Sequence, residues 1–144
     1  MKKIDITNQQ QQAYDLIAST FTSFFLTGKA GSGKTTFLRR VQNEIDKNFI
    51  VLAPTGVAAI LAGGQTIHSF FGFPLEALPI GSVGTINQER YNIIKNVDTI
   101  IIDEVSMVRA DIVDKVDKVL RIVNKTNILF GGKQMIFFGD VFQL

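Results

Sequence analysis

Four short apolar runs constrain the fold of this chain more than any other feature of its sequence. They lie at residues 24–26, 49–53, 99–102 and 134–138, the last two starting with the polar residues Thr99 and Gln134. Runs that are apolar throughout are typical of strands buried on both faces, whereas strands with one face in water alternate apolar and polar residues. The segments between the runs have helical spacing. We therefore expect one α/β domain over residues 1–144, with a parallel sheet and helices on both faces.

Apolar residues three and four positions apart indicate the helices. Residues 7–10 have the form of a capping box, and the helix they begin has an apolar face from Ala13 to Phe21. A second helix starts at about Lys34 and carries its apolar stripe to Ile45. Residues 55–61 and 88–95 predict short helices, and residues 112–123 predict a longer one. Residues 71–85 are rich in glycine and proline and predict irregular structure.

Composition excludes several classes of protein. The 144 residues include no cysteine, which excludes disulfides and thiolate metal sites. No apolar run approaches the roughly 18 residues that a membrane-spanning helix needs, and no apolar stretch follows Lys2 and Lys3. We therefore expect a soluble, cytoplasmic protein with no membrane partner. The net charge of +2 is too small to indicate nucleic-acid binding by itself, so that function must be argued from particular residues.

Residues 28–35 read GKAGSGKT and match the phosphate-loop pattern G-x-x-x-x-G-K-T. Glycines in such a loop let backbone N–H groups wrap a polyphosphate, and the following helix adds the partial positive charge of its amino end. The lysine supplies a full charge to the β- and γ-phosphates, and the threonine hydroxyl suits Mg²⁺. The residues expected to bind ATP with Mg²⁺ are Gly28, Ala30, Gly31, Ser32, Gly33, Lys34, Thr35 and Thr36. The alternative, a glycine-rich turn that happens to contain a lysine, is disfavoured by the strand before it and the helix after it.

An acidic pair, Asp103-Glu104, follows the third apolar run directly. A carboxylate at the carboxyl end of a parallel strand points into the crevice where such sheets bind ligands. Asp103 is therefore the expected second anchor for Mg²⁺, with Thr35 the first, and Glu104 is expected to polarise the water that attacks the γ-phosphate. The alternative role for Asp103 is to cap the segment that follows. The adjacent glutamate favours hydrolysis over phosphoryl transfer to another acceptor.

Five stretches, taken in order, resemble the first motor domain of superfamily 1B DNA helicases, with the Pif family nearest and the RecD-like and phage Dda helicases next. They are ITNQQ at residues 6–10, GKAGSGKTT at 28–36, APTGVAA at 53–59 through TIHSFFG at 66–72, DEVSMV at 103–108, and GGKQ at 131–134 through GDVFQL at 139–144. Many families share the phosphate loop. The APTGVAA, TIHSFFG and DEVSMV stretches are much more specific, and together the five span nearly the whole chain.

The resemblance implies roles for two glutamines. Gln10 is similar to the family's adenine-reading glutamine, whose amide suits the edge of adenine because it both donates and accepts. A plain capping-box residue is the alternative for Gln10, and the two roles are compatible. Gln143 is similar to the glutamine that senses the γ-phosphate and couples it to the DNA site, which would make Lys34, Glu104 and Gln143 the catalytic residues.

The resemblance also implies a single-stranded DNA site. The residues it assigns to DNA are Pro54, Thr55, Gly56, Thr66, His68, Ser69 and Phe70. Hydroxyl groups and backbone amides can bind phosphate oxygens, and His68 or a phenylalanine can stack on a base. For Phe70, burial in the core is an equal alternative, because most of the twelve phenylalanines of this tryptophan-free chain must serve the core.

The function implied is that of the first motor domain of an ATP-dependent 5′–3′ DNA helicase, acting as a monomer. Its second motor domain in cis, with the arginine finger, is not among these residues. An arginine finger is worth roughly 10³ to 10⁵ in turnover in other nucleotide hydrolases, so the 144 residues alone are expected to be nearly inactive. The alternatives are another P-loop ATPase, such as an AAA-type loader or a nucleotide kinase, and a stand-alone nucleotide-dependent DNA-binding module.

Overall fold

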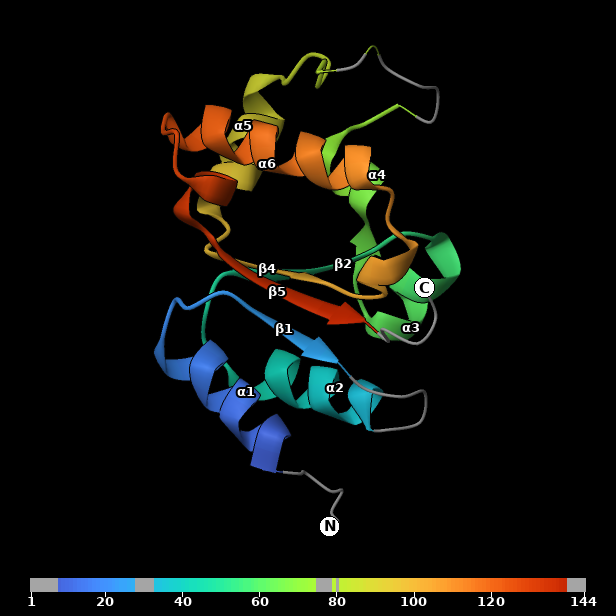
Figure 1. The fold of residues 1–144 in the computed structure, drawn as a ribbon, viewed down its shortest axis with the longest axis vertical. Helices are drawn as coiled ribbons and strands as arrows, with labels where there is room; N and C mark the ends of the chain where they lie inside the picture. The colour runs from blue at the N-terminus through green and yellow to red at the C-terminus, as the bar shows by residue number, and fades with distance from the viewer. Residues whose placement is uncertain (1–7, 28–32, 75–78, 80, 140–144) are drawn as a thin grey trace.

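A five-stranded parallel sheet forms the centre of the protein (Figure 1). The computed structural model describes residues 8–27, 33–74, 79 and 81–139. The strands are β1 (Phe24–Thr27), β2 (Phe49–Ala53), β3 (Gln65–Thr66), β4 (Thr99–Ile102) and β5 (Gln134–Gly139), and their order across the sheet is β1-β5-β4-β2-β3. Every neighbouring pair is parallel. The predicted fold class is thereby confirmed, since the four apolar runs are four of the five strands.

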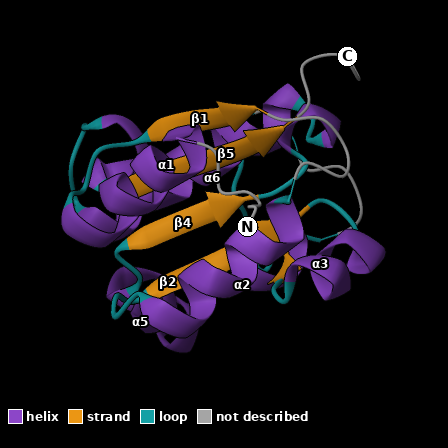
Figure 2. Ribbon diagram, turned by 90° about the horizontal axis from the view of Figure 1, so that it is seen from below, coloured by secondary structure: helices purple, strands orange, loops and turns teal. Residues whose placement is uncertain are grey.

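Helices cover both faces of this sheet. The first two helices, α1 (Asn8–Ser19) and α2 (Lys34–Glu44), lie on one face, and α4 (Ile67–Phe71), α5 (Gln88–Asn96) and α6 (Ala110–Asn124) lie on the other (Figures 1 and 2). Helix α3 (Gly56–Ala62) follows β2 and packs on the β2–β3 edge. Within the described part of the chain, no helix has both the length and the apolar character to cross a membrane.

Alternate residues of the central strands supply two separate cores. Ile101 of β4 and Ile136 of β5 point toward α1 and α2, where Phe37 and Val41 meet them. Their neighbours Ile100, Ile102 and Met135 point the other way and pack against α4, α5 and α6. All of these strand residues are fully buried, which is why the strands are apolar at every position rather than at every second one.

Three local features differ from the sequence-based expectation. Helix α1 ends at Ser19, so Phe21 lies outside it and is 64% exposed rather than part of its apolar face. The two-residue strand β3 and the five-residue helix α4 were not expected, because neither is long enough to show a period. The residue expected to begin the capping box, Thr7, lies outside the described residues.

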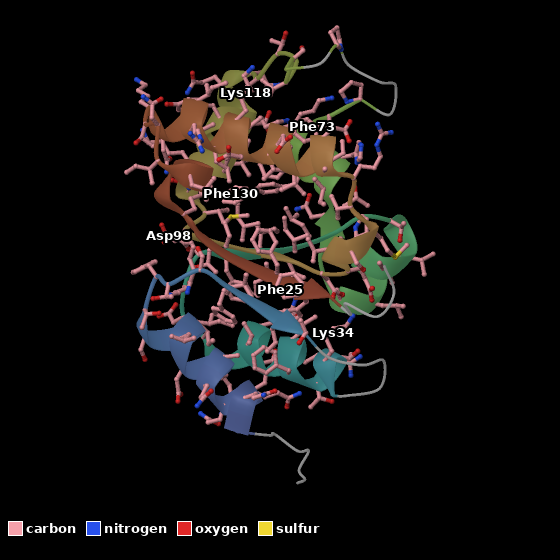
Figure 3. The ribbon with its side chains drawn as sticks, viewed as in Figure 1. Phe25, Lys34, Phe73, Asp98, Lys118 and Phe130 are labelled. Atoms are coloured by element: carbon pink, nitrogen blue, oxygen red, sulfur yellow. The ribbon has the colours of Figure 1, made fainter. Side chains whose placement is uncertain are left out.

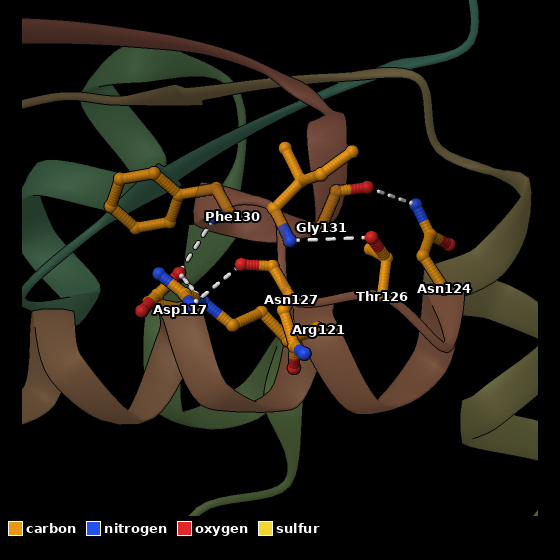
Figure 4. A network of polar contacts seen from close by, with 8 residues as sticks. Asp117, Arg121, Asn124, Thr126, Asn127, Phe130 and Gly131 are labelled. Atoms are coloured by element: carbon orange, nitrogen blue, oxygen red, sulfur yellow. Dashed lines mark hydrogen bonds and ion pairs between the residues drawn. The ribbon is translucent and has the colours of Figure 1, made fainter.

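A hydrogen-bonded network joins α6 to β5 through the 3₁₀ turn η2 (Leu129–Gly132), as Figure 4 shows. Asp117 Oδ1 accepts bonds from the Phe130 N–H at 2.6 Å and from Arg121 Nε at 2.9 Å. The Asn124 side chain donates to the Gly131 carbonyl at 2.7 Å. Gly131 has φ +65°, and a Cβ there would collide with the Leu120 carbonyl, so only glycine fits this close approach.

A buried glutamine connects the elements at the amino end of the sheet. Gln134 is fully buried, and its Nε2 donates to the carbonyls of Leu16 at 3.2 Å and Thr22 at 2.8 Å. Its Oε1 accepts from Thr99 Oγ1 at 2.8 Å and from Lys47 Nζ at 3.1 Å. Because every side-chain hydrogen-bonding group of Gln134 is used, this polar residue can occupy the core.

Candidate active site

The described part of the phosphate loop begins where α2 begins. Gly33 is the residue before the helix and has φ +87°, a left-handed conformation that glycine adopts without steric cost. The helix then starts at Lys34, with Thr35 and Thr36 exposed on its first turn. Strand β1 ends at Thr27, so the pattern is preceded by a strand and followed by a helix, as expected. The loop residues Gly28, Ala30, Gly31 and Ser32 lie outside the described residues.

Lys34, which Figure 3 labels, meets both members of the acidic pair at the carboxyl end of the sheet. Its Nζ lies 3.0 Å from Asp103 Oδ1 and 2.8 Å from Glu104 Oε1. Burial by itself lowers the pKa of the lysine, but the hydrogen bonds and charges of Glu104 and Asp103 outweigh it, so the pKa is raised. Three predicted residues from segments 70 positions apart thus converge on one charged cluster.

The backbone of Glu104 is held in an unusual conformation. Its φ is +53°, in the left-handed region that costs a residue with a Cβ about 1 kcal/mol. Two contacts offset this cost: the Glu104 N–H donates to Asp103 Oδ1 at 2.9 Å, and its carboxylate pairs with Lys34. The chain then enters the 3₁₀ turn η1 (Val105–Met107), which passes over the end of β5 so closely that a Cβ on Gly139 would lie 3.0 Å from Val105 Cγ1.

Of the two glutamines expected in the site, the structure describes only Gln10. Gln10 is partly buried and lies in the first turn of α1, the helix that shares one face of the sheet with α2 (Figure 1). Gln143 lies outside the described residues. Both assignments therefore stay predictions.

The segments expected to bind DNA lie side by side at the carboxyl ends of β2 and β3. Ala53 pairs with Thr66 in the parallel register, so the chain leaves both strands at the same edge. Thr55 caps α3, its hydroxyl accepting a bond from the Ala58 N–H at 3.1 Å, and Thr66 caps α4 in the same way through Ser69 at 3.1 Å. A hydroxyl that already accepts a bond still has its hydrogen to donate, and phosphate oxygens are acceptors. Both threonines therefore keep the group needed to bind a phosphate.

The remaining DNA candidates differ in exposure. Gly56 is exposed, and a Cβ there would meet nothing within 4 Å, so packing gives no reason for a glycine at this position. Pro54 and His68 are partly exposed, and the His68 ring lies edge-on to Phe73 with centroids 6.2 Å apart. Phe70 is a correction. It is 3% exposed and packs in the core edge-on to Phe71, so its ring cannot stack on a base in this structure.

Sequence reasoning missed one residue of this region, Arg90 of α5. Its Nη1 donates to the carbonyls of Ser69 at 2.9 Å and Phe70 at 2.6 Å, the last turn of α4. No sequence signal indicates this contact, because the partners lie about twenty positions apart on separate helices and the acceptors are backbone atoms.

Comparisons with known proteins point to one family. Residues 5–144 match the model of the PIF1-like helicase family. The structure of unliganded Pif1 from a Bacteroides species is 45% identical and has a TM-score of 0.86, over 96% of this chain and 32% of that one. Bacteroides Pif1 in complex with ADP-AlF3 and ssDNA gives the same identity and TM-score over 96% of this chain and 33% of that one. The human ATP-dependent DNA helicase PIF1 is 39% identical over 126 residues, which are 85% of this chain and 20% of the human protein.

The chain thus spans about a third of the length of these solved relatives and about a fifth of the human one. The family model nevertheless covers nearly all of its residues, including both carboxylates that meet Lys34 and both threonines that cap α3 and α4. This protein belongs to the PIF1-like helicase family.

Proposed function

We propose that this chain is the N-terminal motor domain of an ATP-dependent DNA helicase, binding MgATP and single-stranded DNA as a monomer and coupling hydrolysis to 5′–3′ movement when its second motor domain is present. One observation carries the proposal most directly: Lys34, Asp103 and Glu104 converge at the carboxyl end of the sheet, where the two threonine-capped segments also begin. That arrangement places a triphosphate-binding group, a carboxylate pair and phosphate-binding hydroxyls on one side of the molecule.

The residues present fit a nucleotide with its magnesium ion. Asp103 is 4% exposed and already lies 3.0 Å from a cationic group, the Lys34 ammonium, so its surroundings accept positive charge. In the proposed state Asp103 and the Thr35 hydroxyl hold Mg²⁺, while Lys34 and the amino end of α2 bind the phosphates. A bound magnesium ion supplies charge neutralisation on the phosphate oxygens.

Glu104 has the role of general base in this proposal. Its carboxylate is partly exposed, with 27% of its side-chain surface in contact with solvent, so a water molecule can reach it. When Lys34 turns to the phosphates, this carboxylate is released to accept a hydrogen bond from the attacking water. Gln10 would bind adenine and Gln143 would respond to the γ-phosphate, as the family resemblance implies.

The DNA strand in this proposal crosses the ends of β2 and β3. The hydroxyl groups of Thr55, Thr66 and Ser69 donate to phosphate oxygens, the exposed amide at Gly56 does the same, and His68 contacts a base. The solved Bacteroides Pif1 in complex with ADP-AlF3 and ssDNA is 45% identical to this chain, which supports the proposal that this chain binds single-stranded DNA.

Relatives three or more times longer than the matched region support the proposal that a second motor domain completes the site. An arginine finger contributed by such a domain is worth roughly 10³ to 10⁵ in turnover, so the 144 residues alone should bind nucleotide yet hydrolyse it very slowly. In a fluorescence unwinding assay with MgATP they should separate no duplex. Robust unwinding by this chain would contradict the one-domain assignment.

DNA binding is tested by anisotropy of a labelled dT oligonucleotide at low salt, with and without a slowly hydrolysed ATP analogue. The wild-type chain should bind, and Gly56→Ala should weaken binding with no loss of thermal stability, because the added methyl group meets no protein atom. Arg39→Ala, on an exposed position of α2, is the matched control and should bind as wild type. Absence of oligonucleotide binding by the wild type would refute the proposed function.

A further inference from the structure

Helix α4 is too short to hold its own conformation. It has five residues, Ile67–Phe71, and isolated helices of this length are unstable in water. Its amino end is capped by Thr66, and its carboxyl end turns at Gly72, where φ is +71°. The His68 carbonyl is satisfied locally by the N–H groups of Gly72 and Phe73. The carbonyls of the last turn need a partner from elsewhere.

Arg90 supplies that partner. One guanidinium nitrogen, Nη1, donates to the Ser69 carbonyl at 2.9 Å and the Phe70 carbonyl at 2.6 Å. The guanidinium also packs against the turn, since a Cβ on Gly72 would lie 2.6 Å from Arg90 Nε. Hydrogen bonds from a charged donor are roughly twice as strong as neutral ones and are directional. The contact therefore sets the orientation of the end of α4.

The backbone at Arg90 is held in place by contacts that do not involve α4. Helix α5 is capped by Asn87, whose Oδ1 accepts from the Arg90 N–H at 2.8 Å. Ile94 of the same helix is fully buried, and Tyr91 Oη donates to the Val123 carbonyl of α6 at 2.9 Å. The packed α5–α6 pair thus carries the arginine whose guanidinium binds the end of α4.

Apolar packing alone does not provide this support. Ile67, Phe70 and Phe71 bury one side of α4 in the core. Burial of apolar surface is non-directional, so it keeps the helix on the sheet without fixing its rotation or its last turn. The opposite side carries Thr66, His68 and Ser69, the groups assigned to DNA.

We propose that Arg90 is a positioning residue for single-stranded DNA: by binding the last carbonyls of α4 it holds Thr66, His68 and Ser69 in the arrangement that contacts the strand. The inference rests on the proposed function. Arg90 acts through α4, so its removal should weaken DNA binding even though the guanidinium itself touches no DNA.

A double-mutant cycle tests this, with binding of a labelled dT oligonucleotide by the purified protein as the readout. Arg90→Ala should lower the affinity about tenfold, the effect typical of losing charge-assisted hydrogen bonds. His68→Ala should lower it severalfold in the wild type and much less in the Arg90→Ala background, because the histidine is no longer held in place. Arg90→Lys should recover most of the affinity, since one ammonium group can also donate to two carbonyls.

Two further readouts separate positioning from other roles. The dependence of log affinity on log salt concentration should keep its slope in Arg90→Ala, whereas a lost phosphate contact reduces that slope by about 1. Nucleotide affinity should stay within about twofold of the wild-type value, because α4 is not part of the nucleotide site. If Arg90→Ala does not fold, Arg90→Met keeps the aliphatic stem and takes its place. Arg39→Ala is again the control for loss of one positive charge.

The outcomes are distinct. Wild-type affinity in Arg90→Ala or Arg90→Met, full additivity with His68→Ala, or a slope reduced by about 1 each overturns the positioning role. A wild-type protein that binds no oligonucleotide refutes the proposed function itself. A wild-type protein that binds, with Gly56→Ala weakened and Arg90→Ala unchanged, leaves the proposed function standing and refutes this inference alone.

Discussion

Replacing Glu104 by glutamine should tighten nucleotide binding by this domain. The Lys34 ammonium lies 2.8 Å from Glu104 Oε1 and 3.0 Å from Asp103 Oδ1. To bind the β- and γ-phosphates, Lys34 must break at least its ion pair with Glu104. The free energy of that ion pair is subtracted from the free energy of nucleotide binding. A glutamine at this position holds the lysine less strongly, so less free energy is lost.

The expected change in nucleotide affinity depends on how far the Lys34–Glu104 ion pair is exposed to solvent. Both side chains are in partial contact with solvent, 37% for Lys34 and 27% for Glu104, so the pair belongs with partly exposed ion pairs rather than buried ones. Such pairs contribute about 0.2–1 kcal/mol, and at the upper end the expected gain is about fivefold in nucleotide affinity. In a chain that carries the second motor domain, the same substitution should lower turnover by about 10² to 10⁴, the usual effect of losing a general base.

Titration with a fluorescent, slowly hydrolysed ATP analogue in excess Mg²⁺ measures the affinity. Glutamine also removes a negative charge near the triphosphate, so Glu104→Asp is the matched control: it keeps the charge but is one methylene shorter and loses the 2.8 Å contact. Both variants should bind more tightly than wild type. Wild-type or weaker binding by Glu104→Gln would refute the reasoning, and tightening by glutamine alone would assign the effect to charge rather than to the ion pair.

Three further predictions concern stability, each measured by urea unfolding. Gly131→Ala should cost about 2–4 kcal/mol, because its φ is +65° and its Cβ would collide with the Leu120 carbonyl; a loss below about 1 kcal/mol would contradict that geometry. Gln134→Leu should cost about 3 kcal/mol by leaving the Thr22 carbonyl and the Thr99 hydroxyl without their partner, whereas the Leu16 carbonyl still accepts from Thr20; a neutral effect would show that water replaces the amide. Burial lowers the pKa of Lys133 in the folded protein below its ordinary 10.5. Between these two pKa values the unfolded chain binds more protons than the folded one, so the free energy of unfolding rises with pH. Lys133→Met should show a smaller rise between pH 7 and pH 10, and an identical rise in both proteins would exclude this cause.

Most of the fold was predictable because the decisive patterns are local. Strand β2 is an unbroken apolar run, β4 is apolar after Thr99, and α6 carries an apolar stripe whose inner residues are fully buried. The elements that were missed, β3 and α4, are two and five residues long. Elements this short show no period, and they form because neighbouring elements satisfy their hydrogen bonds.

The two phenylalanines of α4 show a second limit. Sequence alone left Phe70 equally suited to the core or to a base, because a phenylalanine on a short segment has no neighbours that reveal its direction. The register of β2 with β3, and the turn of α4 that follows, point both Phe70 and Phe71 into the core. The hydroxyl and imidazole side chains of the same helix then remain on the outer side.

By itself the sequence determined the parallel α/β fold, the phosphate-loop lysine and the acidic pair, because these depend on residue type and on short spacings along the chain. The tertiary structure decided which groups meet. It brought Lys34 within 3.0 Å of two carboxylates 70 residues away, held Glu104 at a positive φ, buried Phe70, and placed Arg90 on the last carbonyls of α4. These contacts depend on strand order and helix packing, which bring distant segments together through interactions that no local pattern in the sequence specifies.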